Sequence, residues 1–162
     1  MTTLTAGEYH IRNGRWPVAR SAIEDKSLNP KPVFTLWQDS QVRGPWQFEP
    51  SINRNEFVFR NAGAPTGVLP PAGDNQKLFA FLRGEEPTLW KVKHVPSAGP
   101  NSFVITSAAD GKFWFSIPPR PGADSTIPGA PNQVEIRRLL FNPVEPITYP
   151  PEVIFEITRV LY

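Results

Sequence analysis

The chain has 162 residues and a formal net charge of +2, with 17 Lys and Arg against 15 Asp and Glu. This length predicts one domain, spanning 1–162, with a single core. The basic residues are scattered along the chain, which does not favour nucleic-acid binding. No apolar run is long enough to cross a bilayer, so we expect no membrane association. The absence of Cys excludes disulfides, a thiolate nucleophile and a Cys-based metal site.

The remaining composition bears on location and on loops. Residues 1–7 lack the basic and apolar regions of a signal peptide, and no Asn-x-Ser/Thr sequon occurs, so we expect a cytoplasmic protein. We also expect a monomer. Proline is abundant at 20 of 162 residues, against an ordinary share of roughly 5%. These prolines cluster between the apolar runs, where they predict stiff loops.

Three stretches along the chain are copies of one pattern. Each copy opens on an alternating strand, at 7–13, 55–61 and 101–107, and closes on an aromatic-x-apolar triplet, at 46–48, 90–92 and 155–157. The repeats span about 7–50, 55–97 and 101–160. A fixed period of this length indicates repeated supersecondary units that share a core. Three units of four strands predict an all-β fold, a β-trefoil of twelve short strands.

In chain order, the expected strands are 7–13, 16–22, 33–37, 45–49, 55–61, 65–69, 77–82, 89–94, 101–107, 112–117, 134–141 and 153–160. Alternation places a set of large apolar residues on the core face, namely Tyr9, Ile11, Trp46, Phe48, Phe57, Phe59, Trp90, Val92, Phe103, Ile105, Phe155 and Ile157. Trp16, Trp37 and Trp114 fall outside the repeat frame, so we expect these three side chains to be exposed. The third repeat is longer than the others by about 15 residues, mostly at 118–131, a size typical of an elaborated loop.

Signals for catalysis are weak. His10 and His94 lie on separate strands with no ligand or triad spacing around them. No nucleophile elbow, phosphate-binding loop or dinucleotide fingerprint is present. We therefore expect a binding protein rather than an enzyme, with no catalytic residue, cofactor or metal.

The segment 23–32 contains a basic residue followed by a small one, Lys26-Ser27, and then Pro30 and Pro32. An inhibitor of a trypsin-like protease needs a stiff loop that offers Lys or Arg to the carboxylate of the enzyme's specificity pocket. The loop Asp25, Lys26, Ser27 and Leu28 meets this need. Arg120 and Lys31 do not, because each is followed by proline, while Arg20-Ser21 and Arg43-Gly44 are possible specificity sites closer to strands.

The repeated openings and the closings at 90–92 and 155–157 resemble those of the small, cysteine-free β-trefoil protease inhibitors of mushrooms (basidiomycetes). The resemblance covers essentially the whole chain. It implies a protease as partner, and in the cospin-type serine protease inhibitors the reactive loop lies between the second and third strands, at Lys26-Ser27 here. By resemblance to Kunitz-type inhibitors, Asn13 would support this loop, and the sequence of the segment itself predicts that Pro30 stiffens it.

The same resemblance implies two further functions. In the clitocypin and macrocypin branch, papain-type cysteine proteases are blocked by two loops, which here contain Gly14, Arg15 and Trp16, and then Ser40 and Gln41. Legumain-type enzymes would be met by Asn61. The second possibility is a carbohydrate-binding lectin, with Trp114 as the sugar platform.

Overall fold

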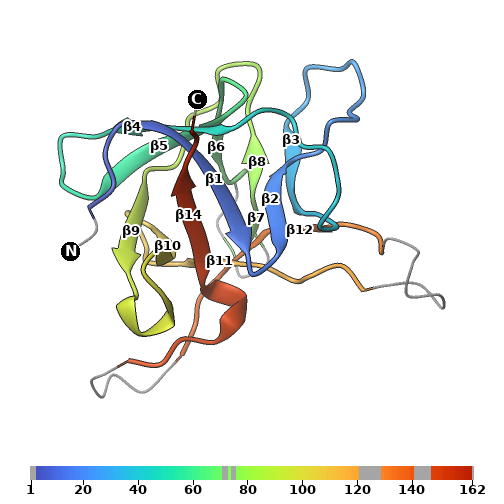
Figure 1. Cartoon of the computed structure of the whole chain (residues 1–162). Helices are drawn as coiled ribbons and strands as arrows, with labels where there is room; N and C mark the ends of the chain where they lie inside the picture. Colours follow the sequence, from blue (N-terminus) through green and yellow to red (C-terminus); the bar gives the residue numbers. More distant parts are fainter. Residues whose placement is uncertain (1–2, 71–72, 74–75, 121–128, 141–146, 162) are drawn as a thin grey trace.

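The structure is a computed structural model that describes residues 3–70, 73, 76–120, 129–140 and 147–161. The described residues form fourteen strands and two short 3-10 helices (Figure 1). The strands are β1 (Gly7–Asn13), β2 (Trp16–Arg20), β3 (Lys31–Thr35), β4 (Trp46–Pro50), β5 (Glu56–Asn61), β6 (Ala64–Gly67), β7 (Gln76–Lys77), β8 (Phe79–Ala80), β9 (Trp90–His94), β10 (Ser102–Ser107), β11 (Phe113–Phe115), β12 (Asn132–Gln133), β13 (Glu135–Arg137) and β14 (Phe155–Arg159). The helices are η1 (Pro96–Ala98) and η2 (Pro151–Val153).

The strands pair antiparallel and close on themselves. β1 bonds to β14 on one side and to β4 on the other, and the pairing continues from β14 through β10, β9 and β5 back to β4. Closure removes the free edges of these strands. Loops that leave a closed barrel begin and end at rigidly held strand ends, so they can present residues to a partner.

The prediction of a twelve-stranded β-trefoil is wrong. The all-β class is confirmed, but the described residues form fourteen strands rather than twelve, and part of these strands close into a β-barrel. Two of the expected strands differ most from the structure: 77–82 is divided into β7 and β8, and 134–141 is reduced to β13, with the separate strand β12 directly before it. Both boundaries fall where the segment changes its pairing partner: β7 pairs with β13 but β8 with β3 and β6, and β12 pairs with β3 but β13 with β11 and β7.

Three wholly buried residues meet where the partners change. The N–H of Val33 donates to the carbonyl of Leu78 (3.1 Å), that of Leu78 to Val134 (2.9 Å) and that of Val134 to Val33 (2.9 Å). Because each residue bonds to two different neighbours, no two-strand ladder runs through this point. The hydrophobic alternation does run through it, which is why the sequence indicated single strands. The other ten expected strands match within two residues at each end.

The predicted core is confirmed at its strongest positions. All twelve residues assigned to the opening and closing strands are at most 5% exposed. Aromatic rings fill the centre, where Phe48 stacks on Phe59 with ring centroids 4.1 Å apart. Such dense apolar packing gives the barrel the rigidity that its loops depend on.

The expected exposure of Trp114 is wrong, because its side chain is 0% exposed. Its ring lies 5.4 to 5.8 Å from those of Trp46, Phe59, Trp90 and Phe155. Val18 of β2 and Thr66 of β6 occupy the positions that correspond to Trp114 in β11. Both are smaller than tryptophan, so the one large indole fills the space that three residues of equal size would otherwise share. Trp16 and Trp37 are half-buried. Of the expected insertion at 118–131, only 118–120 and 129–131 lie within the described residues.

Candidate functional site

The loop 21–30, which we call the Lys26 loop, joins β2 to β3 and stands out from the barrel beside β3 (Figure 1). Lys26 is exposed at its outer part, and Leu28 is 52% exposed. The ammonium of Lys26 makes no hydrogen bond or ion pair with any residue that the structure describes. The structure therefore leaves this cation free to meet an acidic group on a partner.

The residues on either side of Lys26 bond to each other. The backbone N–H of Ser27 donates to Asp25 Oδ1 (2.9 Å), and the Ser27 hydroxyl donates to the same oxygen (2.5 Å). The N–H of Asn29 then donates to Ser27 Oγ (3.3 Å). These bonds fix the backbone around Lys26 as a local turn of the kind that Asp and Ser favour.

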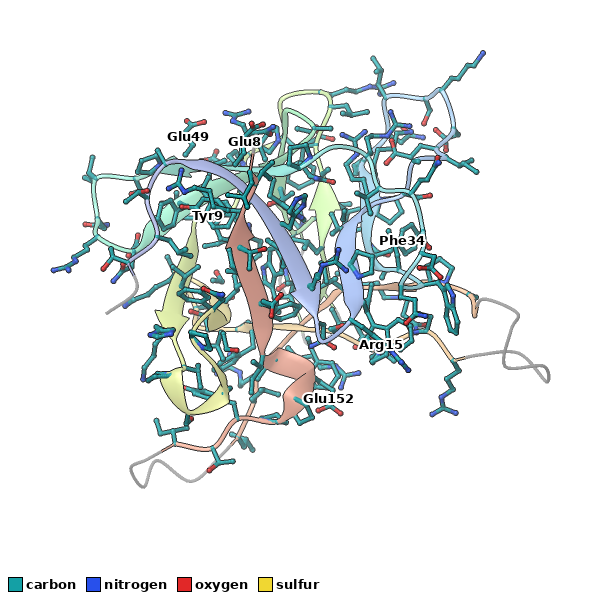
Figure 2. The ribbon with its side chains drawn as sticks, in the orientation of Figure 1. Glu8, Tyr9, Arg15, Phe34, Glu49 and Glu152 are labelled. Carbon is teal, nitrogen blue, oxygen red and sulfur yellow. The ribbon has the colours of Figure 1, made fainter. Side chains whose placement is uncertain are left out.

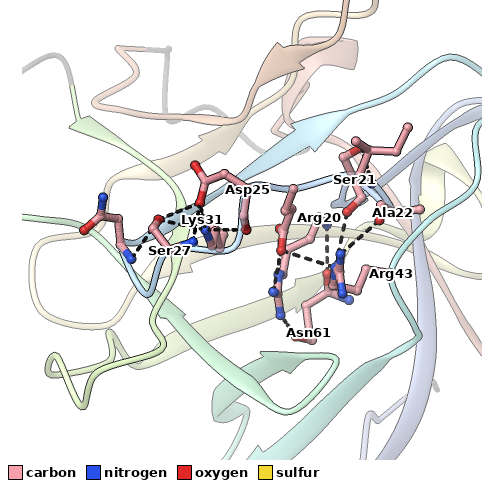
Figure 3. A network of polar contacts seen from close by, with 11 residues as sticks. Arg20, Ser21, Ala22, Asp25, Ser27, Lys31, Arg43 and Asn61 are labelled. Atoms are coloured by element: carbon pink, nitrogen blue, oxygen red, sulfur yellow. Dashed lines mark hydrogen bonds and ion pairs between the residues drawn. The ribbon is translucent and has the colours of Figure 1, made fainter.

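A buried lysine reaches the loop from its far end. Lys31 begins β3, with a side chain only 4% exposed, and its Nζ donates to the Asp25 carbonyl and to Ser27 Oγ, both at 3.2 Å (Figure 3). It also forms an ion pair with the Asp25 carboxylate. The hydrogen bond from Lys31, followed by those from Ser27, lowers the pKa of Asp25 from 3.8 to about 2. Asp25 is therefore ionised at neutral pH and remains so at pH values well below its ordinary pKa of 3.8.

The start of the loop is held by a cluster of three charged residues. Arg20 donates to both carboxylate oxygens of Glu24, at 2.7 and 3.0 Å, and the two side chains are 6% and 8% exposed. Arg43 adds a second cation at 3.2 Å from Glu24 and donates to the carbonyl of Ala22 (2.9 Å). Figure 3 shows Arg43 beside Ser21 and Ala22. Two-oxygen pairing of this kind fixes orientation as well as position.

Asn61 ties this cluster to the barrel. Its Oδ1 accepts the backbone N–H of Arg20 (2.8 Å), and its carbonyl accepts Arg20 Nη1 (3.1 Å). Its Nδ2 donates to the carbonyls of Gly44 and Pro45, both at 3.3 Å. Asn61 ends β5 and is 0% exposed, so the predicted encounter of this side chain with a legumain-type enzyme is wrong.

Asn13 occupies the matching place at the end of β1 but serves another segment. It is 6% exposed, and its Nδ2 donates to the carbonyls of Pro151 and Ile154, both at 2.9 Å. The predicted support of the Lys26 loop by Asn13 is therefore corrected, since the bonds of Asn13 hold η2 and the residue after it. Pro30, the other predicted support, is half-buried directly before Lys31, and its ring fixes φ at the entry to β3.

The two loops expected to block a cysteine protease lie against each other. The rings of Trp16 and Trp37 are 5.3 Å apart, and the guanidinium of Arg15 lies 4.7 Å from the Trp16 ring centroid. Gly14 and Arg15 are exposed at the turn between β1 and β2, where Figure 2 labels Arg15. In the second loop, Ser40 donates its N–H to the Trp37 carbonyl (2.9 Å). The carbonyl of Gln41, which is exposed, accepts the N–H of Ala22 (3.4 Å) at the base of the Lys26 loop.

Sequence reasoning missed Lys31, Glu24 and Arg43 as parts of the site. Lys31 could have been found, because it alternates with Val33 and Thr35 on the buried face of β3. Glu24 and Arg43 give no comparable signal, since their pairing depends on how two loops meet. Arg20 and Arg43 are both unsuitable as specificity residues, because Arg20 is buried and Arg43 is bound to the loop's own carbonyls.

Two negative findings apply to the described residues. Among them, no group of three or more His, Asp or Glu side chains is placed to hold a metal ion. No helix among them is long and apolar enough to span a bilayer.

Comparisons with known proteins identify relatives over the full chain. A family model described as Peptidase inhibitor I66 matches residues 1–159. A serine protease inhibitor from Lentinula edodes is 33% identical over 158 residues, which cover 97% of this chain and 99% of the relative. The structure of a proteinase inhibitor from Coprinopsis cinerea has a TM-score of 0.77 at 30% identity, covering 98% of this chain and 100% of that one. A Culex salivary protein of the Cysteine and Tryptophan-Rich family shares the fold alone, with a TM-score of 0.65 at 15% identity over 99% of this chain and 98% of its own.

Proposed function

Because the chain belongs to the peptidase inhibitor I66 family, and is therefore a protease inhibitor rather than an enzyme, we propose that it inhibits a trypsin-like serine protease through the loop 25–28. Lys26 enters the specificity pocket of the enzyme, and Ser27 follows the bond presented for cleavage. The observation that carries this proposal is an exposed, unpaired Lys26 between two residues that are held from the buried side of the loop.

The mechanism is substrate-like occupation of the enzyme's active site. The Lys26 ammonium meets the carboxylate at the floor of the pocket, a charge-assisted contact between groups that lose their water together. The loop is ordered before binding, so little conformational entropy is lost on association. The relative from Lentinula edodes, named a serine protease inhibitor, supports the choice of a serine protease.

The direct test replaces Lys26 with Asn and measures the inhibition constant for trypsin. We expect a rise of about 100-fold or more, the size of effect at a central interface residue. The thermal midpoint should not change, because the Lys26 side chain is exposed. Lys93→Asn is the matched control, as Lys93 is an exposed lysine on β9 and should leave inhibition intact. Full inhibition by the Lys26 variant would remove this loop from consideration.

A second candidate function is inhibition of papain-type cysteine proteases by the paired loops around Trp16 and Trp37. The ring contact of 5.3 Å between these residues favours it, because it joins two loops into one protruding edge. Papain inhibition that survives Lys26→Asn and is lost on Arg15→Glu would support this function. The expectation of a lectin has lost its basis, since the expected sugar platform, Trp114, is buried in the core.

A further inference from the structure

Lys31 contacts both sides of the bond that the loop presents. Its Nζ lies 3.2 Å from the Asp25 carbonyl and 3.2 Å from Ser27 Oγ, and it pairs with the Asp25 carboxylate. Asp25 precedes Lys26 in the chain, whereas Ser27 follows it. If the bond between Lys26 and Ser27 were cut, these contacts would join the two new chain ends to the same buried ammonium.

Lys31 is itself fixed by its place in the barrel. It pairs with Ala80 of β8 in the β3–β8 ladder, and its side chain is 4% exposed. A buried ammonium without hydrogen-bond acceptors is strongly unfavourable. Asp25 and Ser27 supply those acceptors, so releasing either chain end would leave the cation under-bonded. The loop therefore supplies hydrogen-bond acceptors to the Lys31 ammonium, and Lys31 in turn fixes the loop to the barrel.

We infer that Lys31 is a positioning residue which keeps the ends of a cleaved Lys26–Ser27 bond together, so that the protease rejoins them instead of releasing a product. This inference rests on the proposed function of the Lys26 loop. The hydrogen bonds from Ser27 to Asp25 Oδ1 span the same bond and act in the same direction.

The chemistry is that of a serine protease acting in both directions. The protease serine oxygen bonds to the Lys26 carbonyl carbon, the bond from that carbon to the Ser27 nitrogen breaks, and the serine proton passes through the protease histidine to the new Ser27 amine. Because Lys31 and Asp25 hold Ser27 in place, its amine attacks the acyl ester, re-forms the peptide bond and returns the proton to the protease serine. Water enters the acyl-enzyme site only when the amine leaves, so the clamp favours rejoining over hydrolysis.

The test compares the intact protein with Lys31→Met under catalytic trypsin, following the cut at Lys26–Ser27 by mass spectrometry until the ratio of cut to intact protein is constant. We expect this ratio to rise about tenfold or more in Lys31→Met, the effect of losing a hydrogen bond to a charged group. The cut form of the variant should also rejoin more slowly. Lys77→Met is the matched control, because Lys77 is exposed on β7 and its replacement should leave the ratio unchanged.

Asp25→Ala provides the same test without replacing a buried side chain, since the Asp25 side chain is 75% exposed. It should raise the ratio as Lys31→Met does. The double variant should raise the ratio further, but by less than the product of the two single effects, because the two variants share the Lys31–Asp25 ion pair while each also removes contacts of its own. An unchanged ratio in both single variants, with trypsin still inhibited by the parent protein, would overturn the inference alone. A parent protein that neither inhibits trypsin nor is cut at this bond would overturn the proposed function and the inference with it.

Discussion

Replacing Asn61 with Ala should weaken both the fold and the inhibition, whereas Asn13→Ala should weaken the fold alone. The two asparagines end β5 and β1 at matching places and are 0% and 6% exposed. The difference between them is what they bond to. Asn61 holds Arg20 at the start of the Lys26 loop, whereas Asn13 holds Pro151 and Ile154 at η2.

The cost to stability follows from the number of hydrogen bonds that each side chain makes. Asn61 makes three and Asn13 makes two. At about 1 kcal/mol for each net bond, the free energy of unfolding falls by about 3 kcal/mol for Asn61→Ala and about 2 kcal/mol for Asn13→Ala. In a domain of this size these losses lower the thermal midpoint by about 6–12 °C and about 4–8 °C.

The assay pairs urea unfolding of each variant with its inhibition constant for trypsin, measured well below both midpoints. Asn61→Ala should weaken inhibition by about tenfold, because a loosened loop must be ordered on binding. Asn13→Ala should inhibit as the parent does. Equal inhibition by the two variants, at the expected losses of stability, would show that the conformation of the loop at Arg20 does not depend on Asn61.

Two further predictions concern charge and packing. The Asp25 carboxyl should titrate near pH 2 by NMR, and its pKa should return toward 3.8 in Lys31→Met. Because folding lowers this pKa, the stabilising effect of the carboxylate is complete above about pH 3.8 and is lost as the pH falls through about 2. An Asp25 pKa near 3.8 in the parent protein would mean that the ion pair with Lys31 does not form in solution. Trp114→Ala should lower the free energy of unfolding by about 4 kcal/mol in urea, since it empties the centre of the core, and a loss below about 1 kcal/mol would contradict the central place of this ring.

The sequence predicted the parts of the fold that local alternation determines. The core faces of β1, β5 and β10 follow from residues such as Tyr9, Phe59 and Ile105, and all three are buried. Alternation gives no sign of where a strand changes partner, so the division at Leu78 and the separate strand β12 before Val134 were missed. Both features depend on contacts between residues more than 40 positions apart, which only the folded chain brings together.

The position of the loop between β2 and β3 was predictable from the strand assignments, but the residues that hold the loop were only partly predictable. Lys26 stands out by its neighbours in sequence, and whether it is the specificity residue stays a prediction. Asn13 and Asn61 look alike in sequence because both end an opening strand of a repeat. Their roles differ because their partners differ: Asn61 accepts the N–H of Arg20, which also pairs with Glu24, whereas Asn13 donates to carbonyls at η2.

Two kinds of cation lie at the loop: those that bond to the protein's own oxygens and hold the loop in place, and Lys26, which is exposed. Arg20 and Arg43 share the buried Glu24, and Lys31 bonds to Asp25 and Ser27, so these three charges are already occupied by the protein's own oxygens. Lys26 is left for a partner. If Lys26 is the specificity residue, as we propose, then stiffness and specificity belong to different side chains, and a change at position 26 should select a different protease pocket while the loop keeps its shape. If the specificity residue also made the internal hydrogen bonds of the loop, replacing that residue would change the specificity and the stiffness of the loop together.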